Sequence, residues 1–111
     1  MIHIIQTKAT PTQLTEMLEE LDPIIKLAVD VRRKILAGGG LMHADCEAVL
    51  IENGSQQDDI WGANWIPTTQ TIEFEALINI RPRNQNYSIT IQNPVVKQQV
   101  ENISRELLEG V

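Results

Sequence analysis

Residues 41–80 read LMHADCEAVLIENGSQQDDIWGANWIPTTQTIEFEALINI, and this stretch decides the predicted fold. Apolar-rich runs and turn-forming segments alternate along it, in the order 45–52, 53–58, 59–66, 67–70 and 71–80. The first turn contains asparagine followed by glycine, and the second begins with proline, which cannot continue a central strand. We therefore predict three antiparallel strands joined by two turns.

The third run has the clearest strand pattern, because its apolar and polar residues alternate. The turn length places Ile66 opposite Thr71, and directly opposed residues point to the same face of a sheet. One face then collects the apolar residues of all three strands: Ala44, Cys46, Ala48, Leu50, Trp61, Ala63, Trp65, Ile72, Phe74, Ala76, Ile78 and Ile80. We predict that the two tryptophans belong to the core and do not stack on a base or a sugar.

The opposite face of this predicted sheet is acidic and polar at one end and apolar at the other. The first end holds Asp45, Glu47, Asn64, Glu73 and Glu75, and the second holds Val49, Ile51, Ile60 and Leu77. An apolar half-face of this size is not left bare on a stable monomer. We therefore predict that the four apolar residues form an interface, covered by the C-terminal helix or by a partner.

The segment before residue 41 is predicted to be a short edge strand, residues 2–5, followed by two helices. The first helix begins at Thr10, since threonine followed by proline is typical of a helix N-terminus. The second begins at Asp22 by the same pattern and ends at the glycines 38–40. Apolar residues recur at helical spacing in both: Leu14, Met17, Leu18 and Leu21, then Ile24, Leu27, Ala28, Val31 and Ile35. Asp30 is expected to form ion pairs with Lys26 and Lys34 on the outer face of the second helix.

After residue 80 we predict a polar loop over 81–88, a possible fourth strand over 89–91 and a last helix that begins at Asn93. Val96, Val100, Ile103 and Leu107 form the buried stripe of that helix. The fold class is therefore α+β, in the order β-α-α-β-β-β-(β)-α. It has an antiparallel sheet of three to five strands, two N-terminal helices and one C-terminal helix. Residues 1–111 are predicted to form a single domain.

Composition limits the class of protein. The chain has 111 residues, a net charge of −6 and one cysteine, so it forms no internal disulfide, as is usual in a reducing cytoplasm. Its start lacks the pattern of a signal peptide, and no stretch approaches the roughly 20 apolar residues of a membrane span. We expect a cytoplasmic protein without membrane contact.

The charges are unevenly distributed, because residues 38–80 contain acidic residues and no lysine or arginine. The acidic residues are Asp45, Glu47, Glu52, Asp58, Asp59, Glu73 and Glu75. Such a block repels phosphate groups, whose binding depends on lysine and arginine, and attracts cations or a basic partner. We therefore expect no nucleic-acid partner.

Polar residues gather at one end of the predicted sheet and in the 81–88 loop, which is long enough to be functional. The candidate ligand-binding residues are His43, Asp45, Asn64, Asn79, Arg81, Arg83, Asn86 and Ser88. A divalent-cation site is a separate possibility, formed by Asp45, Glu47, Glu73 and Glu75. These carboxylates would have to converge across roughly 10 Å of sheet, and strand faces often carry glutamates. We expect no other cofactor and identify no catalytic residue.

Several phrases of the sequence resemble a small bacterial family of uncharacterised proteins, a domain of unknown function. They are Ala28-Val29-Asp30, Gly39-Gly40-Leu41-Met42-His43-Ala44-Asp45, Gly54-Ser55-Gln56-Gln57, Trp61-Gly62-Ala63-Asn64 and Ile78-Asn79-Ile80-Arg81-Pro82. The resemblance extends from residue 24 to the end and implies no activity. The predicted topology also resembles the RelE/ParE toxin fold, in which two helices follow the first strand. Those toxins are basic proteins, so this likeness does not imply their activity.

Three hypotheses of function follow. The first is a non-enzymatic cytoplasmic interaction or regulatory module, with a homodimer or another protein as partner. The second is a small-ligand or enzymatic site at the sheet end, using His43, Asp45, Asn64, Arg81 and the 81–88 loop. The third is a toxin-like binder of RNA or of a protein partner.

Overall fold

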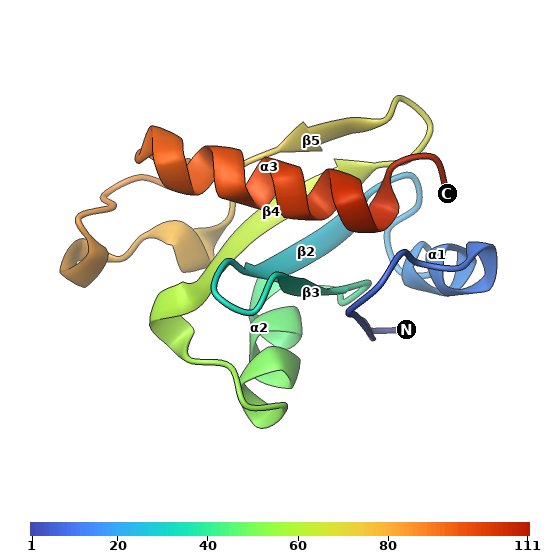
Figure 1. The fold of residues 1–111 in the computed structure, drawn as a ribbon, viewed down its shortest axis with the longest axis horizontal. Helices are drawn as coiled ribbons and strands as arrows, with labels where there is room; N and C mark the ends of the chain where they lie inside the picture. The colour runs from blue at the N-terminus through green and yellow to red at the C-terminus, as the bar shows by residue number, and fades with distance from the viewer.

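The computed structural model describes all residues, 1–111, and shows a five-stranded antiparallel sheet with three α-helices (Figure 1). The elements are β1 (His3–Ile5), α1 (Pro11–Met17), β2 (Ile25–Asp30), β3 (Ile35–Gly38), α2 (His43–Glu52), β4 (Ile60–Ile66), β5 (Thr71–Glu73) and α3 (Pro94–Leu108). Short 3-10 helices span Gln57–Asp59, Leu77–Asn79 and Pro82–Asn84. The strands lie in the order β1-β3-β2-β4-β5. The predicted α+β class and the antiparallel sheet are confirmed.

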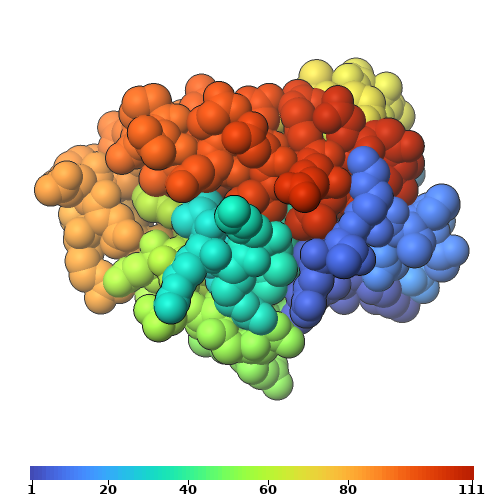
Figure 2. All heavy atoms as spheres, in the orientation of Figure 1, coloured from blue at the N-terminus to red at the C-terminus, as the bar shows by residue number.

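The sheet is covered on both faces, so the structure has two apolar clusters. On one face α1 and α3 pack on β2, β3 and β4, and Figure 2 shows α3 spread along this side of the molecule. Trp61 and Trp65 belong to this cluster and are 5% and 0% exposed, which confirms their prediction as core residues. The other face carries α2, whose Cys46 and Leu50 pack against β2, β3 and β4.

The segment predicted as a second helix is instead the hairpin of β2 and β3. Its residues are apolar on both sides because both faces of the sheet are covered, and such a run cannot be distinguished from a helix by its periodicity alone. Asp30 forms the turn: it is 0% exposed, and its Oδ1 accepts hydrogen bonds from the amides of Arg32 and Arg33 at 2.9 Å each. The ion pairs expected of Asp30 are therefore not formed.

The run predicted as the first strand of the sheet, 45–52, is instead part of α2. Cys46 and Leu50, four residues apart, face the sheet, whereas Ala48 between them is exposed. The alternation of these apolar residues was mistaken for a strand. The place predicted for this run beside β4 is taken by β2, in a register that sets Ala28 opposite Gly62.

The helix starts and one turn are as predicted. Thr10 Oγ1 accepts a hydrogen bond from the amide of Gln13, and Asn93 Oδ1 accepts bonds from the first amides of α3. Ile66 lies opposite Thr71, as the turn length indicates. The third predicted strand is shorter than expected, because β5 ends at Glu73 and the chain then turns into a 3-10 helix.

None of the three α-helices combines the length and the apolar character that crossing a membrane would require. The likeness to the RelE/ParE fold depended on two helices between the first and second strands. The structure has a single helix there, α1, and this removes the basis of that comparison.

Candidate functional site

The segment after β5 folds back over the face of the sheet that carries α2. The segment packs tightly against Gly62 of β4, where a Cβ atom would lie 2.4 Å from the Cβ of Ala76 and 3.0 Å from Cγ1 of Ile78. Real Cβ atoms do not approach a carbon atom so closely, so β4 needs glycine at this position. Residues 76–78 and α2 therefore lie over the same face of the sheet.

The side chain of Asn79 connects this segment to β4. Asn79 is 0% exposed, and its Oδ1 accepts a hydrogen bond of 2.8 Å from the amide of Gly62. Its Nδ2 donates to the carbonyl of Gly62 at 3.0 Å. Because β5 ends at Glu73, the amide side chain of Asn79 takes the hydrogen bonds that a longer β5 would have made.

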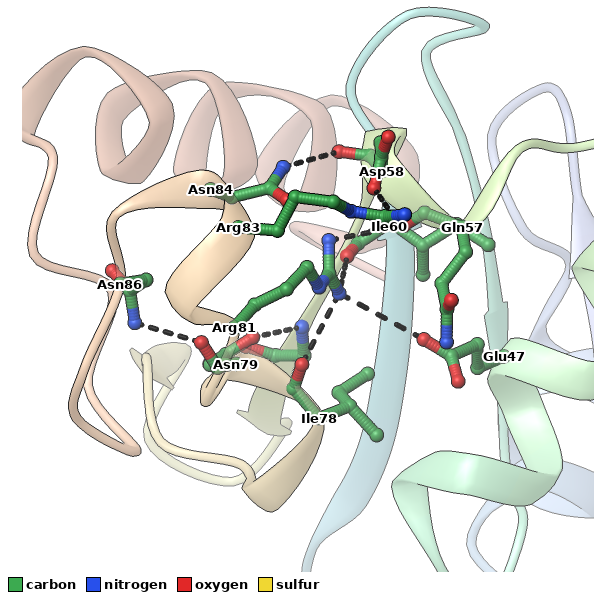
Figure 3. Close-up of polar contacts among 11 residues, drawn as sticks. Glu47, Gln57, Asp58, Ile60, Ile78, Asn79, Arg81, Arg83, Asn84 and Asn86 are labelled. Atoms are coloured by element: carbon green, nitrogen blue, oxygen red, sulfur yellow. Dashed lines mark hydrogen bonds and ion pairs between the residues drawn. The ribbon is translucent and has the colours of Figure 1, made fainter.

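Arg81 is the second buried polar residue of this segment (Figure 3). Its guanidinium donates to the carbonyls of Gln57 at 3.0 Å, Ile60 at 2.6 Å and Ile78 at 3.1 Å. The guanidinium also lies 4.9 Å from the ring centre of Trp61. Burial lowers the pKa of Arg81, and the carboxylate of Glu47, 3.8 Å away, opposes that shift.

Asn86 completes the network. Its Nδ2 donates to the carbonyls of Asn79 at 2.8 Å, Ser88 at 2.9 Å and Thr90 at 3.0 Å, and its Oδ1 accepts from the amide of Gln92. The polar groups of Asn79, Arg81 and Asn86 are thus used within the chain. These contacts stabilise the path of the segment after β5.

The other residues of the predicted ligand site are dispersed. Arg83 forms an exposed ion pair with Asp58, and Ser88 Oγ accepts a hydrogen bond from the amide of Thr90. Asp45 accepts a hydrogen bond from the amide of Met42 at the start of α2. Only His43 and Asn64 lie together, in hydrogen-bond contact.

The predicted cation site is not formed. Asp45 and Glu47 belong to α2, Glu73 to β5, and Glu75 to the segment that follows. Glu47 is paired with Arg81. The structure has no group of three or more histidine, cysteine, aspartate or glutamate side chains that could hold a metal ion. The prediction failed because it placed a helical segment in the sheet.

The four residues of the predicted interface also differ in their surroundings. Ile60 is 0% exposed in the cluster under α2, so it cannot contact a partner. Val49 is half-buried, whereas Ile51 and Leu77 are 43% and 73% exposed. Leu77 is the most exposed large apolar side chain of the four, and it lies beside a groove.

The groove separates the start of α2 from residues 75–78 and has a volume of about 360 Å³. Its lining consists of Lys26, Met42, His43, Ala44, Glu75, Ala76, Leu77, Ile78 and Ile89. Most of these residues are apolar, and the groove is open to solvent. Met42, Leu77 and Ile89 are each more than 40% exposed, so apolar surface continues onto the rim.

Two polar residues of the lining, His43 and Lys26, lie beside Asn64 of β4. His43 Nε2 lies 2.8 Å from Asn64 Oδ1 and 3.0 Å from the carbonyl oxygen of Ala63. Both partners are acceptors, so Nε2 carries the proton. Burial lowers the pKa of His43, which keeps the imidazole neutral near pH 7. Lys26 is directly opposite Asn64 in the pairing of β2 with β4.

Sequence reasoning singled out His43, Glu75 and Leu77 as candidate site residues, and these three line the groove, but it gave no site role to the other side chains of the lining. Lys26 was assigned to the outer face of a helix, although a single lysine within the apolar run 24–29 is also the signal of a polar position on a buried strand. Ala76, Ile78 and Ile89 carry no chemical signal, because their role depends on the path of the chain after β5.

A family model described as "Protein of unknown function (DUF5674)" matches residues 3–107 of the chain. The resemblance to a domain of unknown function is thereby confirmed. No curated protein and no solved structure is significantly similar to this chain.

We expect Asn79→Ala to lower the free energy of unfolding by about 3 kcal/mol, because it leaves the buried amide and carbonyl of Gly62 without partners. Urea unfolding measures the change. Asn84→Ala is the control: Asn84 lies in the same segment, is half-buried, and donates one long hydrogen bond of 3.4 Å to Asp58. It should change stability by less than about 0.5 kcal/mol. Equal losses in the two variants would contradict the role of Asn79.

We expect stability to fall as the pH is lowered below 6.5, the ordinary pKa of histidine. The pKa of His43 is lowered in the fold, so the unfolded chain binds a proton first, and stability is lost between 6.5 and the lower folded pKa. The pH dependence of the free energy of unfolding is compared between the wild type and His43→Gln. The difference isolates the contribution of His43, since His3 is common to both. Nuclear magnetic resonance (NMR) titration of the His43 ring is the direct measurement, and a pKa at or above 6.5 would refute the assignment.

Proposed function

We propose that this chain, which belongs to the DUF5674 family of proteins of unknown function, is a non-enzymatic interaction module that binds an apolar group of a protein partner in the groove. The observation that carries the proposal is the groove itself, with its volume of about 360 Å³ and its exposed apolar rim. Apolar surface that is left open and concave on a folded protein is typical of a binding site.

The chemistry of the lining supports binding more than catalysis. The lining has no serine, threonine or cysteine beside His43 that could act as a nucleophile with it. The Nε2–H of His43 is already directed at two acceptors, which fixes the ring. The lining therefore offers a shaped apolar surface with a few polar groups at one end.

We infer a bacterial cytoplasm as the setting of this module. Its one cysteine, Cys46, is a buried free thiol, which suits a reducing compartment. The net charge of −6 disfavours a nucleic-acid partner and leaves a protein as the partner. The bacterial source rests on the resemblance described for the sequence.

The groove is tested with N-acetyl-leucinamide, a minimal apolar side chain on a peptide backbone, titrated into the ¹⁵N-labelled protein. We expect binding on the order of millimolar, seen as amide shifts at Leu77, Ile78 and Ile89, because one side chain contributes little affinity. Ala44→Trp should fill the groove and abolish these shifts. Gln98→Trp is the control, since Gln98 is exposed on α3 across the sheet. Shifts that are absent, or that persist in Ala44→Trp, would refute the proposal.

We also propose that two copies associate through the outer face of α2. Ile51 is 43% exposed, and exposed Ala48 precedes it by three residues, on the same side of the helix. A small residue at this place allows two helices to approach closely. Sedimentation equilibrium should give twice the chain mass of 12.5 kDa for the wild type and a single chain for Ala48→Glu. A wild type that sediments as a single chain at high concentration would exclude this dimer.

A further inference from the structure

We propose that the groove recognises the carboxyl terminus of a partner polypeptide whose last side chain is apolar. This inference rests on the proposed function and specifies the partner. It combines an unpaired ammonium, the start of α2, a carboxylate on the opposite wall and an apolar cavity.

Lys26 supplies the positive charge at one end of the groove. On β2, Lys26 and Ala28 point to the same face, and Ala28 packs in the cluster under α2. The half-buried Lys26 side chain is therefore directed beneath the start of this helix. The chain has 15 acidic and 9 basic residues, yet no carboxylate oxygen lies within 4.0 Å of the Lys26 ammonium. A half-buried ammonium without a counter-ion favours an anionic ligand.

The start of α2 adds to this preference. Met42, His43 and Ala44 line the groove, and they are the N-cap and the first two residues of the helix. The amides of His43 and Ala44 donate to no acceptor within the chain. Amides at a helix N-terminus carry partial positive charge and bind carboxylates. Since His43 is neutral, it adds a polar surface here and no second charge.

The opposite wall explains why a peptide fits better than a simple fatty acid. Glu75 also lines the groove, so a ligand must place its own carboxylate toward Lys26 and away from Glu75. A peptide can do both, because its terminal carboxylate is negative and its preceding backbone N–H groups can donate to the Glu75 carboxylate. A fatty acid has no such donor.

The apolar part of the groove accommodates the last side chain. Ala44, Ala76 and Ile78 line it, and a volume of about 360 Å³ is sufficient for a leucine-sized group. The exposed rim formed by Met42, Leu77 and Ile89 then lies where preceding residues of the peptide would leave the groove. Such capture of a terminal carboxylate is a known mode of peptide recognition.

The experiment compares three probes by NMR titration: acetyl-Gly-Ala-Leu with a free carboxylate, the same peptide as its amide, and hexanoate. We expect the free acid to bind at least about tenfold more tightly than the other two. If the peptide amide binds as tightly as the free acid, this inference is overturned, while the proposed apolar docking groove stands. Hexanoate as tight as the peptide acid would overturn it in favour of a small carboxylate. If no probe binds, the proposed function fails as well.

Lys26→Met tests the residue that carries the inference. It should reduce the affinity for the free acid to that for the amide, while the affinity for the amide stays unchanged. Lys97→Met is the matched control, because Lys97 is exposed on α3 above Phe74. Wild-type protein gives an independent readout that needs no variant: raising sodium chloride from about 0.05 M to about 0.5 M should weaken binding of the acid only. A preference for the acid that is unaffected by both salt and Lys26→Met would refute the inference.

Discussion

The side-chain amide of Asn79 replaces a missing piece of strand, and the local structure around the groove depends on it. Strand β5 ends at Glu73, so the amide and the carbonyl of Gly62 in β4 would otherwise be buried without partners. A buried unpaired polar group costs about 1–3 kcal/mol, so the two bonds are a strong constraint on the segment. Asn79 thereby holds residues 76–78 against the sheet. The groove exists because this wall and α2 cover the same face of the sheet but are in contact along only part of their length.

The sequence was sufficient for features that depend on local chemistry. The caps at Thr10 and Asn93, the turn from Ile66 to Thr71 and the buried tryptophans were all predicted correctly. It was insufficient where the outcome depended on the whole fold. Residues 25–30 are apolar on both sides because helices cover both faces of the sheet, and such a run has no alternation to show that it is a strand. The segment of α2 was misassigned for the opposite reason: its apolar residues alternate as in a strand, although it forms a helix.

Two wrong assignments, a helix in place of β2 and β3 and a strand in place of α2, account for the errors in the predicted site. Placing α2 in the sheet brought four carboxylates together that the structure separates, and it assigned Ile60 to an interface although α2 buries it. The polar residues of the 79–86 segment were predicted to bind a ligand. Their polar groups bind the chain itself, because a segment that crosses a sheet face must satisfy its own buried backbone. The apolar walls of the groove had no signal in the sequence, since no short-range pattern shows which alanine or isoleucine lines a cavity.

The most direct test of this account is a trans-hydrogen-bond NMR coupling between the amide nitrogen of Gly62 and the side-chain carbonyl carbon of Asn79. Detection of this coupling, with a Gly62 amide that exchanges with solvent only on global unfolding, is the result the account expects. A Gly62 amide that shows no coupling and exchanges as fast as an open loop would contradict it. In that case residues 76–78 would not be held against β4, and the groove would lose its second wall.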